Sequence, residues 1–207
     1  KNMDYVGGID SIDMPTDDLT GKSKPSDFCL IIKASKRCKK VTNNRPIHRL
    51  KFRPRDPEEA YEEALKALWL FGCSAGFENG KEAFKTWAKK LDCIKFISLA
   101  VEIDTTQNPN KKQLTFRGNT NTGKDKEINF LNLAHYIAYY VNRVTDLALL
   151  KSLKGLTYKN LTKRDDCAAA MQAETTDISP SKLSVALGNR KDKTAYRAKI
   201  GGAFFNE

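Results

Sequence analysis

The chain has 207 residues, enough for one domain with a hydrophobic core, and 40% of them are hydrophobic, which excludes a wholly disordered chain. Its formal net charge of +11 favours an anionic partner: a nucleic acid, an anionic membrane surface or an acidic protein. The five cysteines form no CxxC pair, which excludes a zinc framework or a dense disulfide scaffold. Free thiols in an intracellular reducing compartment, cytoplasmic or nuclear, are the simplest interpretation.

The first 27 residues are polar and irregular in pattern. They carry six aspartates against three lysines, a net charge of −3. Such a segment offers little apolar surface to bury, so we predict a flexible acidic N-terminal arm over residues 1–27. We divide the rest into a globular core, residues 28–155, and a basic C-terminal segment, residues 156–207, that is either free or packed on the core.

Two strands are predicted next, at residues 28–34 and 47–52. The first is rich in β-branched and aromatic residues, and the second alternates between two sets of side chains. Asparagines and a proline supply turn chemistry between them, so a hairpin is predicted. No Asp or Glu lies between Asp27 and Asp56, whereas this region holds ten Lys or Arg residues. It is the most strongly basic part of the chain.

A helix is predicted after the hairpin from its end signals. Asp56 can cap its N-terminus, Pro57 suits the first helical position, and Gly72 suits the C-terminal cap. Between residues 80 and 117, apolar residues recur at the spacing typical of helices or of strands. The additional elements are a helix at residues 80–91, a central strand at residues 93–103 and a return strand at residues 113–117.

The stretch from residue 127 to residue 153 contains no Gly or Pro and carries two adjacent apolar stripes at helical spacing. Stripes this wide indicate a buried helix. Asn129, His135 and Arg143 interrupt the apolar run well below the roughly 20 residues needed to cross a bilayer. We therefore predict an α+β fold: a small antiparallel sheet packed on several helices around this one long buried helix, with polar arms at both ends.

The segment after this helix has a weaker pattern. Asp165 or Asp166 can cap a short helix. Residues 182–199 carry six Lys or Arg against one Asp, a net charge of +5. Two phenylalanines at positions 204–205 follow a glycine pair and suggest an anchor on this core or on a neighbouring copy. We expect a homo-oligomer that assembles through its terminal arms.

Two motifs suggest enzyme chemistry, and each departs from its pattern. Residues 118–125, GNTNTGKD, nearly match the phosphate-binding loop GxxxxGK[ST], but Asp125 stands where a hydroxyl would hold magnesium, so nucleotide hydrolysis is not predicted. Glu102 and Asp104 end a predicted strand, where paired acids can hold magnesium in nucleases, but no further lysine or carboxylate follows closely. The chain has two histidines, so no catalytic residue, metal site or cofactor is predicted.

The basic hairpin predicts the main function, because its like charges repel one another unless a polyanion neutralises them. Arg49, Lys51 and Arg53 alternate along one strand and would share a face at a spacing of about 6.6 Å, similar to the phosphates of an extended single strand. We expect non-enzymatic nucleic-acid binding, to single-stranded RNA rather than duplex DNA, with strong salt dependence. The expected contacts are Lys36, Arg37, Lys39, Lys40, Arg45, Arg49, Lys51, Arg53 and Arg55, with a second strip of Lys191, Lys193, Arg197 and Lys199.

Terminal arms and a basic groove are what a self-assembling coat or nucleocapsid subunit needs. A viral structural protein is therefore the leading hypothesis, and a virion is a second candidate location. Two alternatives stay open. A peripheral matrix or scaffold protein would use the same hairpin on an anionic membrane. A metal-dependent nuclease would use Glu102 and Asp104.

Overall fold

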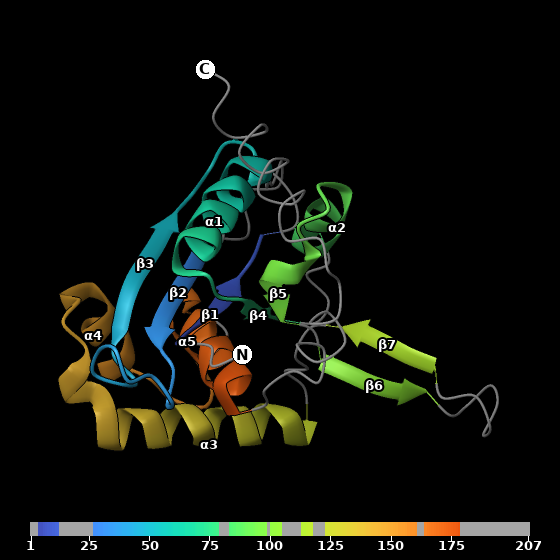
Figure 1. Ribbon diagram of the computed structural model, residues 1–207. Coiled ribbons are helices and arrows are strands. Elements are labelled where there is room, and N and C mark those ends of the chain that lie inside the picture. Colours follow the sequence, from blue (N-terminus) through green and yellow to red (C-terminus); the bar gives the residue numbers. More distant parts are fainter. Residues whose placement is uncertain are drawn as a thin grey trace, which may run out of the picture.

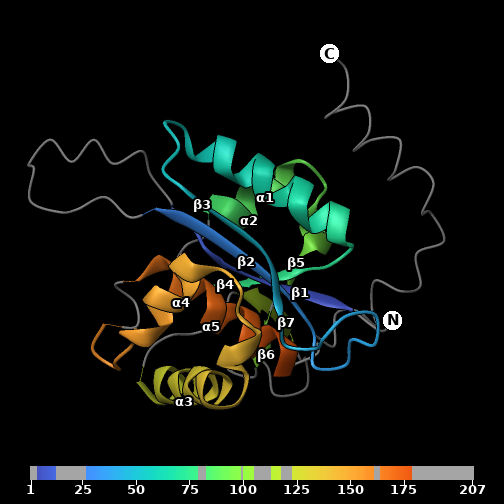
Figure 2. The same ribbon diagram turned by 90° about the vertical axis from the view of Figure 1, so that its left-hand side faces the viewer.

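The computed structural model describes residues 4–12, 27–78, 83–98, 100–104, 113–117, 123–160 and 164–178 (Figure 1). These residues form a mixed α+β fold with a five-stranded sheet, which confirms the predicted fold class. Figure 2 shows the sheet between two layers of helices. The predicted basic strip at residues 182–199 lies outside the described residues.

The strands of the main sheet are β1 (Tyr5–Asp10), β2 (Phe28–Ala34), β3 (Pro46–Phe52), β4 (Ala75–Phe77) and β5 (Ile97–Ser98). Their spatial order is β3-β2-β1-β4-β5. The β1–β2 and β2–β3 pairs are antiparallel, which confirms the predicted hairpin, whereas β4 is parallel to both β1 and β5. The sheet is therefore mixed and not antiparallel as predicted, because helical crossovers carry the chain back before β4 and before β5.

β1 lies in the middle of the sheet, which corrects the prediction of a polar arm over residues 1–27. All of its residues except Tyr5 are buried. The packing requires both of its glycines. A Cβ on Gly7 would lie 2.8 Å from the Cβ of Ala75, and a Cβ on Gly8 would lie 2.1 Å from the carbonyl oxygen of Ala169. Residues 13–26 of the predicted arm lie outside the described residues.

The first helical layer consists of α1 (Pro57–Phe71) and α2 (Ala83–Lys90). As predicted, α1 begins at Asp56, whose side chain accepts a hydrogen bond from the backbone N–H of Glu58, and ends at Gly72 in the left-handed conformation. Tyr61 of α1 contacts the rings of Phe28 in β2 and Phe84 in α2. These aromatic contacts join the layer to the sheet.

The second layer contains α3 (Gly123–Tyr140), a 3-10 turn (Val141–Arg143), α4 (Leu147–Lys154) and α5 (Asp165–Ile178). The single helix predicted at residues 127–153 is therefore divided. The chain becomes extended at Val144, and Asp146 caps α4 by accepting a hydrogen bond from the backbone N–H of Leu149. A short-range cap thus outweighs the continuous apolar pattern at this point.

The central helix of this layer is α5, not the stretch at residues 127–153. α5 lies against β1 and β2, and its Cys167, Ala169 and Met171 are buried with Ile31 of the sheet. In the divided stretch, Tyr139 and Leu147 are 66% and 72% exposed. α5 is rich in alanine, and these small side chains let it approach the sheet closely. It therefore lacks the large apolar stripes by which the sequence indicated a core helix at residues 127–153.

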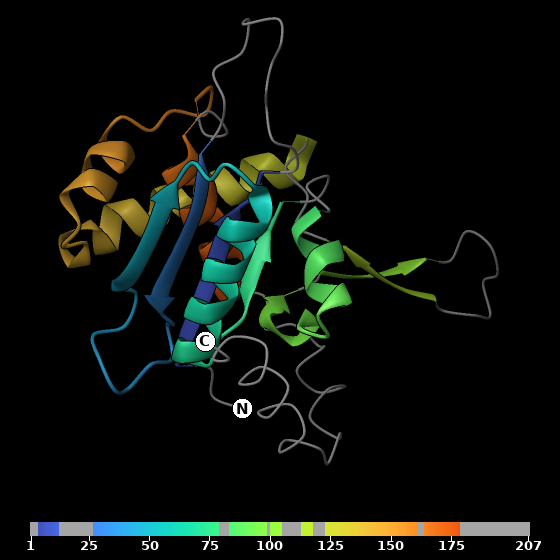
Figure 3. The ribbon, with the colours of Figure 1, turned by 90° about the horizontal axis from the view of Figure 1, so that it is seen from above.

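The predicted central strand at residues 93–103 is also divided. It contains a 3-10 turn (Ile94–Phe96), the short strand β5, and then β6 (Ala100–Asp104). β6 pairs antiparallel with β7 (Gln113–Arg117), as predicted for the return strand, in a separate two-stranded sheet. Figure 3 shows this hairpin extending away from the main sheet. Residues 118–122 of the loop similar to a phosphate-binding motif lie outside the described residues.

Within the described ranges, no helix combines the length and the apolar character needed to cross a membrane. All five cysteines are buried, and none forms a disulfide.

Candidate functional site

The candidate site lies at the edge of the sheet where the parallel strands β1 and β4 end. Asp10 is the last residue of β1 and is 3% exposed. Ile9 of β1 is paired with Phe77 of β4, so Asp10 and Glu78 follow at neighbouring positions on two adjacent strands. In open α/β sheets, ligands bind outside the carboxyl ends of the parallel strands, which is the edge that Asp10 and Glu78 occupy here.

Both acids come from positions that face α5. Gly8, two residues before Asp10, faces the backbone of α5 at Ala169. Ile9 and Phe77 belong to the core cluster on the opposite face, under α1. Because side chains alternate along a strand, Asp10 and Glu78 belong to the α5 face.

The first turn of α5 adds two more carboxylates, Asp165 and Asp166. Asp166 lies near Asp10 across the thiol of Cys29. Cys29 is paired with Asp10 in the β1–β2 register, and its Sγ donates a hydrogen bond to Asp166 Oδ1 at 3.6 Å. Burial raises the pKa of the Cys29 thiol well above its usual range, and the charges of Asp166 and Asp10 raise it further. The thiol stays neutral between the two carboxylates.

Two basic residues of β3 reach the same carboxylates. Arg49 Nε donates a hydrogen bond of 2.6 Å to Asp166 Oδ1. Lys51 Nζ lies 3.0 Å from Asp165 Oδ2, 3.3 Å from Asp166 Oδ2 and 3.7 Å from Asp27 Oδ2. We name this group the acidic edge; its members are Asp10, Asp27, Glu78, Asp165 and Asp166.

The contacts between Asp166 and its basic partners keep Asp166 and Lys51 charged at neutral pH. Burial alone would raise the pKa of Asp166, but the hydrogen bond and charge of Arg49, with the charge of Lys51, hold that pKa below its usual value. Burial likewise would lower the pKa of Lys51, but Asp165 and Asp166 raise it above its usual value. Ser152 Oγ also donates to Asp166 Oδ2 at 3.0 Å, which fixes that carboxylate further.

The acidic edge supplies oxygen ligands of the kind that a hard divalent cation prefers, but its side chains are not arranged around a metal position. Magnesium, manganese and calcium prefer carboxylate oxygens, and this group supplies them without histidine or thiolate ligands. Within the described part of the chain, no group of three or more His, Cys, Asp or Glu is arranged so that it could hold a metal ion. The ammonium of Lys51 already stands among oxygens of three aspartates, so a cation position exists there. A metal ion would need those side chains to rearrange.

The sequence pattern did not indicate Asp10 and Glu78 as site residues, and it indicated Asp165 and Asp166 only as helix caps. A signal for the first two exists in the sequence: each is the acid that ends a short apolar run, at residues 5–10 and 75–78. The position of the second two depends on how α5 packs on β1, which no local pattern indicates.

The predicted nucleic-acid contacts fall into separate groups. Arg49 and Lys51 are paired with the acidic edge. Arg53 and Arg55 are exposed and follow β3 at the same end of the sheet. Five others lie in or beside the loop between β2 and β3, at the opposite end of the hairpin. These are Lys36, Arg37, Lys39, Lys40 and Arg45. The strip of Lys191, Lys193, Arg197 and Lys199 lies outside the described residues.

Two of the loop cations have acidic partners of their own. Lys36 Nζ lies 3.4 Å from Glu174 Oε2, and Lys40 Nζ lies 2.6 Å from Asp4 Oδ2. No acid lies near these residues in the sequence, because one partner directly precedes β1 and the other belongs to α5. The basic hairpin is therefore partly neutralised within the fold.

The acids of the nuclease alternative are placed apart from this site. Glu102 and Asp104 belong to β6, where they pair with Thr115 and Gln113 of β7. They therefore belong to the separate two-stranded sheet and not to the main sheet that carries the acidic edge.

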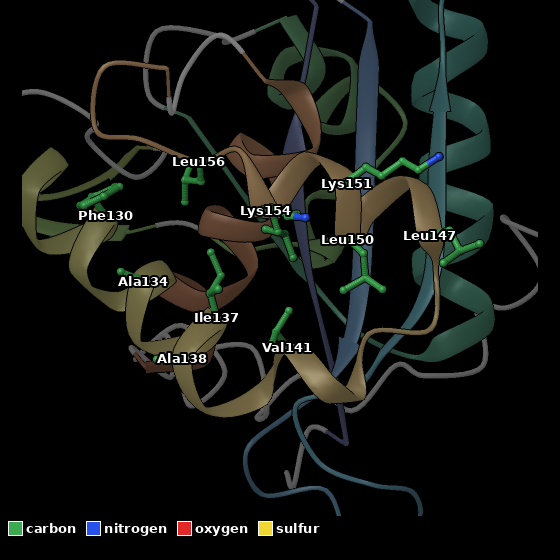
Figure 4. Close-up of a pocket in the computed structure, with 11 residues that line it drawn as sticks. Phe130, Ala134, Ile137, Ala138, Val141, Leu147, Leu150, Lys151, Lys154 and Leu156 are labelled. Atoms are coloured by element: carbon green, nitrogen blue, oxygen red, sulfur yellow. The ribbon is translucent and has the colours of Figure 1, made fainter.

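A second surface feature is a groove of about 710 Å³ between α3 and α4. Figure 4 shows Phe130, Ile137 and Val141 on one side and Leu150 on the other. The lining is apolar apart from Lys151 and Lys154. Such a surface suits an apolar group better than a phosphate backbone.

Comparison with protein-family models, curated proteins and solved structures found no match to this chain.

Proposed function

We propose that this protein is a metal-dependent nuclease whose active site is the acidic edge. The observation that carries this proposal is the placement of Asp10 near Asp166 across Cys29, with Glu78 following the adjacent parallel strand β4. Carboxylates are the ligands with which nucleases hold the divalent ions of phosphodiester cleavage. This keeps the nuclease alternative of the sequence analysis but moves it from Glu102 and Asp104 to different acids.

Four residues have parts in this proposal. Asp10, Glu78 and Asp166 would supply metal ligands once their side chains rearrange, and Asp10 lies on the central strand, the most rigid support available. Arg49 orients Asp166 by its hydrogen bond. A bound divalent ion would stabilise negative charge on the scissile phosphate and make a bound water more acidic.

Substrate binding in this proposal uses the exposed cations nearest the site. Arg53 and Arg55 follow β3 at the end where the acidic edge lies. Arginine grips phosphate oxygens through two parallel N–H donors, so these residues suit the backbone of a nucleic acid. The net charge of +11 supports a polyanionic substrate of either kind, DNA or RNA.

The non-enzymatic hypothesis remains a second candidate because of the loop between β2 and β3. Arg37, Lys39 and Arg45 are exposed there, away from the acidic edge. A coat or nucleocapsid subunit would bind RNA through this loop and assemble with copies of itself; a matrix protein would use the loop on anionic lipid. Both proposals predict binding without cleavage, which separates them from the nuclease.

An intracellular reducing compartment fits either candidate. Five buried cysteines without a disulfide support it, since such thiols persist where glutathione keeps them reduced.

The test is a cleavage assay on plasmid DNA and on a labelled single-stranded RNA, with Mg²⁺, with Mn²⁺ and with EDTA. The nuclease proposal predicts cleavage that needs the metal and falls by about 100-fold or more in Glu78→Gln. A matched control carries Glu102→Gln and Asp104→Asn in the β6–β7 hairpin and is expected to cleave like the wild type. Cleavage lost in the hairpin variant but retained in Glu78→Gln would move the active site back to β6.

A further inference from the structure

An aromatic cluster near the C-terminal end of α3 is exposed to solvent. His135 and Tyr139 lie one helical turn apart and are both exposed, Tyr139 to 66%. Their ring centroids lie 4.4 Å apart, and the ring of Tyr140 lies 6.4 Å from each of them. We name these three residues the aromatic face. They lie outside the buried side of the helix, which Leu133 and Tyr136 form.

The aromatic face is joined to the basic loop between β2 and β3. The guanidinium of Arg143 lies over the ring of Tyr140, with Cζ 4.8 Å from the ring centroid. The same guanidinium donates a hydrogen bond of 2.7 Å to the backbone carbonyl oxygen of Asn43 in the loop. Asn43 Nδ2 in turn donates to the backbone carbonyl oxygen of Lys36 at 3.3 Å. Figure 1 shows this loop beside the C-terminal end of α3, so the aromatic rings and the loop cations belong to one surface.

The loop is held in place where it meets α3. Tyr136 Oη donates a hydrogen bond of 2.9 Å to the backbone carbonyl oxygen of Asn44. Asn44 is buried and has the left-handed conformation, with a φ of 57°. The exposed residues Arg37, Lys39 and Arg45 therefore belong to a loop whose position relative to the aromatic face is set.

Fixed cations beside exposed aromatic rings suit a single-stranded nucleic acid. Cations bind the phosphates of the backbone, and unpaired bases stack on aromatic rings. The guanidinium plane of Arg143 over Tyr140 adds a cation that can also stack on a base. The bases of a duplex are already stacked on one another, and an anionic membrane offers no base to stack. Both would therefore use the cations of this surface without its rings.

We propose that the aromatic face and the β2–β3 loop together form a binding surface for single-stranded nucleic acid. Bases stack on His135 and Tyr139, and phosphates are held by Arg37, Lys39 and Arg45. This inference goes beyond the proposed nuclease function and does not depend on it, because the loop lies at the opposite end of the β2–β3 hairpin from the acidic edge.

The test is fluorescence anisotropy with a labelled single-stranded RNA and a labelled single-stranded DNA, in EDTA so that no metal-dependent cleavage intervenes. Tyr139→Ala should weaken binding by about fivefold or more, because a stacked base loses its ring. The slope of log affinity against log salt should stay as in the wild type, because no phosphate contact is removed. Tyr139→Phe keeps the ring and should bind like the wild type. Tyr139→Leu keeps apolar bulk without a ring and should bind as weakly as Tyr139→Ala.

The matched control is Tyr158→Ala. Tyr158 is another exposed tyrosine of the same helical layer, at 44%, but its ring contacts Phe130, more than two turns of α3 before Tyr139. This variant should bind both strands like the wild type.

A strand of abasic residues separates stacking from phosphate binding. It keeps the phosphates and lacks the bases, so the wild type and Tyr139→Ala should bind it equally. Equal binding of these two chains to the strands that carry bases would overturn the proposal. Binding to phosphatidylserine vesicles without binding to either strand would also overturn it and would assign the surface to a membrane.

The outcomes separate this inference from the nuclease proposal. If no chain cleaves nucleic acid but Tyr139→Ala loses affinity for single strands, the binding surface is supported and the nuclease assignment is wrong. If the wild type cleaves and Tyr139→Ala binds single strands as tightly as the wild type, the nuclease stands and the stacking surface falls.

Discussion

Lys33 of β2 and Glu174 of α5 form an ion pair although 141 residues separate them, and each side chain is 3% exposed. Asp177 Oδ2 lies 2.8 Å from the same ammonium, and Asn44 Oδ1 accepts a hydrogen bond from it at 3.1 Å. One of the ten basic residues of the hairpin region thus joins the sheet to its buried helix.

Removal of this buried cation should destabilise the fold. Lys33→Met leaves Glu174 and Asp177 without their shared partner, and breaking a buried pair in this way costs about 3–5 kcal/mol. Urea unfolding followed by circular dichroism measures the loss. Lys39→Met, in the exposed loop that follows, is the control and should change the free energy of unfolding by less than about 0.5 kcal/mol. Equal stability of the two variants would contradict the role assigned to Lys33.

The close contact between β1 and α5 predicts a strong effect of one methyl group. A Cβ on Gly8 would lie 2.1 Å from Ala169 O and 2.2 Å from Ala173 N, both backbone atoms that cannot turn aside. Gly8→Ala should therefore lower the free energy of unfolding by about 3 kcal/mol or more. Gly72→Ala is the comparison: its Cβ meets nothing within 4 Å, so only its φ of 61° is unfavourable, at about 1–2 kcal/mol. A smaller loss for Gly8→Ala than for Gly72→Ala would show that α5 is not packed as described.

The ion pair of Asp166 predicts how stability depends on pH. Burial raises the pKa of Asp166, but Arg49 and Lys51 outweigh it, so the folded pKa lies below the usual value of about 3.8. Such a group stabilises the fold fully above its unfolded pKa, and this stabilisation is lost as the pH falls through the folded pKa. Asp166→Asn should therefore be less stable than the wild type at pH 7, and the difference should shrink below pH about 3.8. Urea unfolding at a series of pH values measures this; a difference that grows on acidification would contradict it.

The salt dependence of binding distinguishes two candidate surfaces for nucleic acid, the loop between β2 and β3 and the acidic edge. If nucleic acid lies on this loop, a variant with Arg37→Ala, Lys39→Ala and Arg45→Ala should lower the slope of log affinity against log salt by about 3. If it lies at the acidic edge, Arg53→Ala with Arg55→Ala should lower that slope by about 2 and the loop variant should not change it. Fluorescence anisotropy with a labelled single strand, across salt concentrations, distinguishes the two surfaces.

The elements that the sequence predicted well depend on signals close together in the chain. The ends of α1 follow from Asp56, Pro57 and Gly72, and the β2–β3 hairpin follows from its turn residues. The requirement for Gly8 has no local signal, because the α5 backbone that it faces lies 161 positions later in the chain. The composition of a buried, alanine-rich helix such as α5 gives no apolar stripe for a periodic pattern to detect.

The candidate site was missed for a related reason. The basic residues were counted in the hairpin alone, but their partners Asp165, Asp166 and Glu174 lie on α5, far along the chain. The net charge of the hairpin segment indicated strong repulsion between its basic residues. In the folded chain, acids on α5 neutralise part of that charge. Only the sheet order, with β1 beside β4, brings Asp10 next to Glu78.

The measurement that tests the central claim most directly is metal-dependent cleavage by the wild type and by Asp10→Asn, with binding of the same substrate measured in parallel. Asp10→Asn keeps the shape of the side chain but removes a charge, so a circular dichroism melt will establish that it is folded. The account predicts cleavage by the wild type with Mn²⁺, a loss of about 100-fold or more in Asp10→Asn, and binding within about threefold. Equal cleavage by both chains, or tight binding by both without any cleavage, would contradict the assignment of a nuclease site to the acidic edge.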